Sequence, residues 1–268
     1  MAGMRIGASL NINESFRDDA AELETAGYSS LWIAGGQLSS LSLLADVVRA
    51  TEKVDVGSSI VPVEVHDAAS VAALYHELAD TGRLVLGIGG AQVPKPMRML
   101  NAYLDELDEL GVPRAALMLA ALGPRKLELA RDRTNGAIPL LVTPEYTARA
   151  RGVLGPSRRL SVSQLVVLDS DATRAREAVR GIVRFLVGVA GYRNHFARIG
   201  FAEADLADLS DHLVDSVSAW GDEAAIAANV RDLLDAGADD VILSVLPTTR
   251  HPDPHGTYLH LADHLISA

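Results

Sequence analysis

Eight apolar segments of strand length alternate with segments of helical periodicity, and this alternation restricts the possible fold more than any other feature. The predicted strands are Met4–Leu10, Ser29–Ala34, Val54–Val61, Arg83–Ile88, Ala115–Ala121, Gly136–Val142, Ser161–Asp169 and Asp240–Val245. The predicted helices are Glu14–Ala26, Leu41–Ala50, Asp67–Asp80, Met97–Leu110, Pro124–Arg133, Pro144–Val153 and His255–Ser267, with a long helical region from Ala172 to about Ala236.

This order predicts an α/β protein: a closed (β/α)8 TIM barrel with a helical insertion between its seventh and eighth strands. The 268 residues suit a single domain, residues 1–268, and no change in composition divides them. An open doubly wound sheet also alternates strands and helices and is the alternative. Eight units in a chain of this length favour the closed barrel.

Composition excludes several classes of function. A net charge of −11 without any Lys/Arg cluster argues against a nucleic-acid partner. The absence of cysteine excludes disulfides, thiolate nucleophiles and clusters ligated by cysteine. No apolar stretch approaches the roughly 18 residues of a membrane helix. The first residues, MAGMRIGASL, lack the pattern of a secretion signal, so we expect a cytoplasmic protein without a membrane partner.

Five segments, in this order, resemble the luciferase-like monooxygenase family. The likeness extends over nearly the whole chain and is closest to the branch of F420-dependent oxidoreductases. The segments are Ala26–Gly36 (AGYSSLWIAGG), Gly82–Gly90 (GRLVLGIGG), Ala120–Ala130 (AALGPRKLELA), Asn135–Gly155 and Asp211–Leu246.

The resemblance implies a bacterial luciferase-like TIM barrel that binds a cofactor at the C-terminal mouth. It implies an oxidoreductase that transfers hydride between coenzyme F420 and a small organic substrate. The alternatives are an FMN-dependent monooxygenase and a non-catalytic relative that binds the cofactor. It also implies a homodimer, for which the apolar segments Leu41–Ala50 and Val71–Leu78 are the expected interface.

Two turns of the barrel mouth are expected to contact the cofactor ring. After the third strand come Ser58, Ser59 and Ile60, where the resemblance implies a strained, sometimes cis, peptide. Small residues there let the backbone approach a ring, although both serines can equally satisfy strand ends. After the fourth strand, Gly89 and Gly90 permit close approach. Barrels also use glycine in ordinary tight turns, and the spacing is not that of a dinucleotide fingerprint.

The turn after the fifth strand predicts an anion site. Leu122, Gly123, Pro124 and Arg125 open a helix, and the free N–H groups of its first turn attract negative charge. Arg125 adds a positive charge for the phosphate or ribityl tail of the cofactor. The alternative is an ordinary helix start with Arg125 in solvent.

The catalytic acid is not assigned. Relatives often carry an acidic residue or histidine at the end of the second strand, where this chain has Gly35 and Gly36. His66 and Asp67 are substitutes, although Asp67 is also a good helix N-cap. The connection Ala91–Met97 is short where relatives have a longer loop over the substrate. These departures motivate the non-catalytic reading.

Three further groups of residues have both functional and structural interpretations. Arg193 and His195 either line the pocket or lie on a solvated helix face. His260 and His264 lie one helical turn apart, a spacing that can ligate a metal, but no third ligand is evident and no metal site is predicted. Trp32 and Trp220 are interpreted as packing residues.

Overall fold

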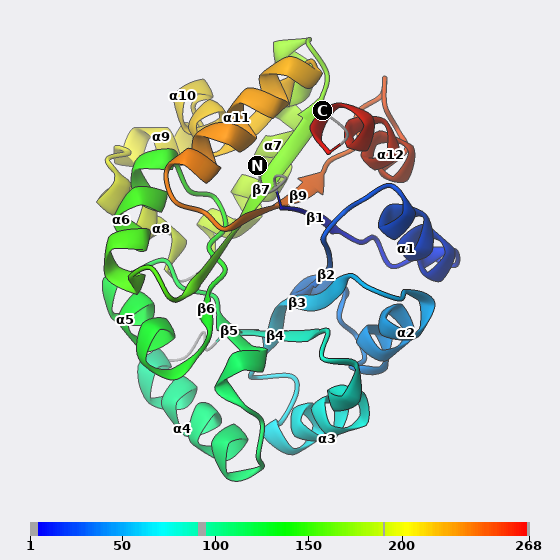
Figure 1. Ribbon diagram of the computed structural model, residues 1–268. Coiled ribbons are helices and arrows are strands. Elements are labelled where there is room, and N and C mark those ends of the chain that lie inside the picture. Colours follow the sequence, from blue (N-terminus) through cyan, green and yellow to red (C-terminus); the bar gives the residue numbers. More distant parts are fainter. Residues whose placement is uncertain (1–4, 91–94, 190, 267–268) are drawn as a thin grey trace.

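The computed structural model describes residues 5–90, 95–189 and 191–266. Eight parallel strands form a closed barrel, because β7 pairs with both β6 and β9 and β9 pairs with β1. Helices surround the strands in chain order (Figure 1). The barrel strands are β1 Ile6–Ser9, β2 Ser30–Ala34, β3 Asp55–Pro62, β4 Leu84–Gly89, β5 Leu117–Leu119, β6 Gly136–Ala137, β7 Arg159–Leu168 and β9 Asp240–Val245.

The helices that follow the barrel strands lie close to their predicted places. They are α1 Phe16–Thr25, α2 Ser42–Ala50, α3 Ala68–Leu78, α4 Pro96–Glu109, α5 Pro124–Arg133, α6 Pro144–Leu154 and α12 Pro254–Leu265. Their apolar faces and the strands share one large buried cluster. Some parts of the predicted segments lie outside the described residues: Met4, residues 91–94 of the connection Ala91–Met97, and Ser267.

The predicted fifth and sixth strands are too long. Residues Arg114–Ala116 form a short 3-10 helix before β5. The strand β6 ends at Ala137, and beyond it only Leu140 forms an isolated bridge, to Ser163. Pro139 has no N–H to donate to a ladder, and Leu141 takes a left-handed φ of 58°. The backbone therefore leaves the sheet early at this point.

The predicted helical region between β7 and β9 consists of several helices and one strand. It contains α7 Ala172–Val187, α8 Tyr192–Ile199, α9 Glu203–Asp208, α10 Asp211–Ser216, the strand β8 Ser218–Gly221 and α11 Glu223–Asp235. The strand β8 pairs with the C-terminal half of β7 and is a ninth strand beside the barrel. Helices α7 to α10 bury a second apolar cluster against β7 and β8. Trp220 lies in β8, and Asp222 caps α11 by accepting a hydrogen bond from Ala225 N at 2.9 Å.

Trp32 fills part of the barrel interior. Its side chain is fully buried together with Met118, Ile138 and Ile242. A Cβ at Gly57 would lie 2.5 Å from the Trp32 ring, so glycine in β3 makes the space for this indole. Gly57 therefore serves the packing of the core, and the candidate cofactor contacts on β3 begin further along the strand.

Candidate functional site

The end of β3 has one buried and two half-buried residues of interest. Ser58 is fully buried, and its Oγ donates to Gly87 O and accepts from Gly87 N. Its side chain therefore joins β3 to β4 and does not face the mouth. Ser59 and Ile60 are half-buried, and the peptide between them is cis, as the resemblance implies. The register between β3 and β4 shifts at this peptide.

Gly35 and Gly89 lie directly against Ile60, where a side chain would clash. A Cβ at Gly35 would lie 2.7 Å from Ile60 O, and a Cβ at Gly89 would lie 2.5 Å from Ile60 Cδ1. Gly36 has open space around it. The position at which relatives carry an acid or histidine is therefore blocked at Gly35 by the backbone of the neighbouring turn, whereas at Gly36 a side chain has room.

Two charged residues beside this turn were not found from the sequence. Gly90 has a φ of +91°, and a Cβ there would lie 2.2 Å from Glu64 Oε2. Lys126, in the first turn of α5, is half-buried near Glu64. Burial lowers the pKa of its ammonium group, and the Glu64 carboxylate opposes that effect. Lys126 directly follows the predicted Arg125, and its place in the same first turn of the helix is the feature of the sequence that could have identified it.

The start of α5 carries the features expected of an anion site. Gly123 is the N-cap without a side-chain cap, and Pro124 stands in the first turn. Arg125 is exposed, and Leu122 and Gly123 are half-buried. The guanidinium of Arg198, from α8, lies 3.3 Å from the place of a Cβ on Gly123. The helix start therefore meets charges from two elements far apart in sequence.

Four cations gather at this end of the barrel, and we refer to Arg125, Lys126, Arg149 and Arg198 as the α5 basic cluster. Arg149 belongs here because it and Arg198 both act electrostatically on His195 and Tyr146. Lys126 interacts electrostatically with Glu64, and Arg149 with Glu145. Other arginines of the chain, such as Arg159, Arg174 and Arg176, pair with aspartates. Positive charges from α5, α6 and α8 therefore meet near this helix start.

His195 holds α8 over the turns that follow β5 and β6. It is fully buried, and its Nε2 donates to Leu141 O at 2.9 Å, because a carbonyl can only accept. Its ring packs edge-on against Tyr146, whose hydroxyl donates to Ala121 O and Leu122 O. Burial lowers the pKa of His195 to about 4, so the ring is neutral. Arg193 instead is exposed and pairs with Glu203.

The two substitutes for the catalytic acid have structural partners. Asp67 is the N-cap of α3 and accepts from Ser70 N at 2.7 Å. Hydrogen bonding to that N–H lowers the pKa of the exposed Asp67 carboxyl. His66 Nε2 lies 3.1 Å from Leu38 O, after the second strand. Asp67 therefore has the capping role that the sequence already offered as its alternative.

A cavity of about 560 Å³ lies on the other side of the mouth. It is lined by the ends of β7 and β8 and by the segment that begins α12, including Asp169, Asp222, Glu223, His251 and His260. Asp169 is buried and paired with Arg174 at 2.9 Å, and this pairing keeps the pKa of its carboxyl well below the usual range. None of the predicted cofactor contacts lines this cavity.

Comparison with known proteins agrees with the predicted family and fold. The family model described as luciferase-like monooxygenase matches residues 13–110. No curated protein sequence matches the chain.

Solved structures share the fold over nearly the whole chain. An F420-dependent secondary alcohol dehydrogenase in complex with an F420–acetone adduct has a TM-score of 0.76 at 14% identity, covering 99% of this chain and 98% of the other. Coenzyme F420-dependent tetrahydromethanopterin reductase from Methanopyrus kandleri has a TM-score of 0.70 at 16% identity, covering 99% of both. The FMN-bound oxygenating constituent of 3,6-diketocamphane monooxygenase from Pseudomonas putida has a TM-score of 0.68 at 14% identity, covering 99% and 98%.

Proposed function

We propose that this luciferase-like TIM barrel is an oxidoreductase that transfers hydride between coenzyme F420 and a small organic substrate. The family match and the fold support an oxidoreductase or monooxygenase of the luciferase-like class. Solved structures of the same fold are described with F420 and with FMN, so both cofactors agree with the fold. One barrel domain, residues 1–268, would carry both cofactor and substrate.

The α5 basic cluster is the observation that carries this proposal. A deazaflavin or a flavin mononucleotide has a phosphate on its tail, and a helix start with arginines from α5 and α8 suits a phosphate. In a chain with a net charge of −11, a gathering of four cations, including the exposed Arg125 and Arg198, suits a ligand that supplies negative charge.

The ring of the cofactor would lie toward Ser59, Ile60 and Gly90. Backbone and small residues form this part of the mouth, which lets a flat ring approach closely. Leu122, Gly123, Pro124 and Arg125 would lie along the tail. Bound there, the cofactor supplies the hydride chemistry, and the protein supplies binding and orientation.

A non-catalytic, cofactor-binding relative is the second candidate. The observation that favours it is the lack of space at Gly35, because an acid or histidine cannot stand there without moving Ile60 O. Asp67 is committed to capping α3. A catalytic acid would then come from another part of the mouth or from the substrate itself.

The test is titration of the purified protein with F420 and, separately, with FMN. Arg125→Ala and Arg198→Ala should each weaken binding about tenfold to a hundredfold, because a charge-assisted contact is worth about 1.5–3 kcal/mol. Arg184→Ala removes an equally exposed arginine from α7 and should leave affinity unchanged. Equal effects of all three substitutions would show only a dependence on net charge and contradict the site.

Turnover separates the candidates. Hydride transfer between F420 and small alcohols or carbonyl compounds supports the leading proposal. Tight FMN binding with oxygen consumption supports the monooxygenase, and tight binding without turnover supports the non-catalytic relative. A protein that binds neither cofactor contradicts all three.

We also propose a homodimer through α2 and α3, as the resemblance implies. The apolar side chains Leu44, Val47, Val71 and Leu74 are buried within the chain's own core, so they cannot form the interface. Contact would use the outer faces of these helices, where Arg49 pairs with Glu77. Light scattering at micromolar concentration distinguishes a dimer from a monomer.

A further inference from the structure

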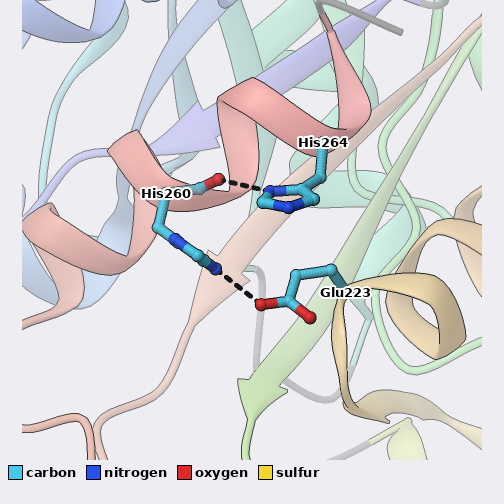
Figure 2. A group of neighbouring side chains, drawn as sticks. All are labelled: Glu223, His260 and His264. Atoms are coloured by element: carbon cyan, nitrogen blue, oxygen red, sulfur yellow. Dashed lines mark hydrogen bonds and ion pairs between the residues drawn. The ribbon is translucent and has the colours of Figure 1, made fainter.

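Two histidines of α12 and one glutamate of α11 converge at the surface beside the 560 Å³ cavity (Figure 2). His260 Nε2 lies 2.6 Å from Glu223 Oε1. His264 follows one helical turn later, with its ring centroid 4.9 Å from that of His260. One ligand atom from each of the three side chains falls within 4.8 Å of the others. No metal site was predicted from the sequence because a third ligand was missing, and the fold brings Glu223 to that place.

His260 points its Nε2 at Glu223, and the His264 ring is oriented by a hydrogen bond to the helix backbone. His264 Nδ1 lies 3.0 Å from His260 O, and since a carbonyl can only accept, Nδ1 carries the hydrogen. The lone pair of His264 is therefore on Nε2. A histidine that binds a metal usually has its other nitrogen fixed in this way by a carbonyl or carboxylate.

We propose that Glu223, His260 and His264 bind a divalent transition-metal ion of the zinc class, with water in a fourth position. Two imidazoles and a carboxylate are a recurrent zinc ligand set, with metal–ligand distances of about 2.0–2.2 Å. Ligand atoms at such distances from one ion lie about 3.3 Å apart in a tetrahedron. The present separations require only small rotations of three side chains that are exposed or half-buried.

An ordinary ion pair is the competing explanation, and the chain contains a suitable comparison. On the same helix, His255 Nε2 lies 2.8 Å from Glu22 Oε2, without a second histidine at the pair. This pair needs no metal to explain it. The Glu223 site differs because a second imidazole, that of His264, lies beside the pair. His264 forms no ion pair with any described residue, and its Nδ1 is bound to His260 O, so its Nε2 lone pair can bind an ion shared with Glu223 and His260.

The position of the site suggests what an ion would do there. It would join the start of α11 to the middle of α12, two helices that pack side by side on the barrel. Glu223 and His260 both line the cavity, which provides an entry path and room for water. The ion would thus fix the wall of the cavity and stabilise the folded state by binding to it alone.

The experiment is calorimetric titration of the full chain, without a polyhistidine tag, with zinc after removal of metals by chelator. We expect one zinc per chain for the wild type and for His255→Ala. His264→Ala and Glu223→Gln should bind zinc at least tenfold more weakly, because each removes one of three protein ligands. Magnesium should not compete, since it prefers oxygen ligands.

Thermal unfolding provides a second measurement on the same variants. Zinc should raise the Tm of the wild type and of His255→Ala, and should leave the Tm of His264→Ala nearly unchanged. Matching Tm values in chelator would show that the variants are folded. The proposal is overturned if the wild type binds no zinc, if Glu223→Gln and His264→Ala bind it as well as the wild type, or if His255→Ala loses as much affinity as they do.

Discussion

His195 is a buried base whose protonation is coupled to folding. Desolvation lowers its pKa from 6.5 to about 4. As the pH falls below 6.5, the unfolded chain takes up a proton that the folded protein refuses until about pH 4. The free energy of unfolding should therefore fall through this window by about 1.4 kcal/mol per pH unit, or about 3 kcal/mol in total.

Denaturant unfolding between pH 7 and pH 4 measures this loss. His195→Gln keeps a donor for Leu141 O but does not titrate, so its free energy of unfolding should change less over the same range. Parallel curves for wild type and His195→Gln would assign the pH dependence to other groups.

Two adjacent glycines offer a sharp comparison at the mouth. Alanine at Gly35 would bring Cβ to 2.7 Å from Ile60 O, whereas alanine at Gly36 meets nothing within 4 Å. We expect Gly35→Ala to lower the free energy of unfolding by about 1–3 kcal/mol, as overpacking does. Gly36→Ala should stay within about 0.5 kcal/mol of the wild type. Chemical denaturation of both variants checks this, and equal effects would refute the crowding at Gly35.

The sequence identified the residue types at the mouth but not their surroundings. The pattern of glycines after the second and fourth strands was visible, yet only the fold brings Ile60 O against Gly35. Ser58 was selected as a cofactor contact because it is a small residue beside the peptide that the resemblance places against the ring, and its hydrogen bonds to Gly87 could not be read from the chain. Chemical identity is local, whereas burial depends on partners far along the sequence.

At the scale of elements, helices and strands with strong hydrophobic periodicity were predicted well, whereas short elements that interrupt a helical region were not. The start of α5 at Gly123 and Pro124 was correct, because its signal lies within four residues. The α5 basic cluster was only partly found, since Arg149 and Arg198 come from α6 and α8. The strand β8 has four residues and lies among helices, so its apolar residues were assigned to a helical pattern.

The early end of β6 has a consequence for the mouth. Beyond Ala137 the chain turns outward, and β7 pairs there with β8 in addition to β9. The helices α7 to α10 pack on this widened part of the sheet. His195 is thereby brought against Leu141, and Arg198 reaches Gly123. The insertion therefore completes the candidate site, although its sequence is far from the turns it covers.

At the scale of the whole molecule, one buried ionic network joins strands across the base of the barrel. Arg159, at the start of β7, forms two hydrogen bonds with the fully buried Asp240 of β9. It also pairs with Asp55 of β3 at 3.0 Å and lies over the Trp32 ring. Burial lowers the pKa of Arg159, and the two aspartates more than offset this. The network ties β3 to the neighbouring strands β7 and β9 at the end opposite the mouth.

Removing the charge of Asp240 should therefore destabilise the barrel without changing the site. Asp240→Asn leaves Arg159 buried with only Asp55, and we expect a loss of about 3 kcal/mol in the free energy of unfolding. Arg5→Ala removes only the exposed partner of Asp55 and should cost less than about 1 kcal/mol. Denaturant unfolding gives both values, and cofactor titration of folded Asp240→Asn should match the wild type, because conservative changes at the base of a barrel affect stability and not binding. A loss for Asp240→Asn no greater than that for Arg5→Ala would show that this network does not hold the barrel together.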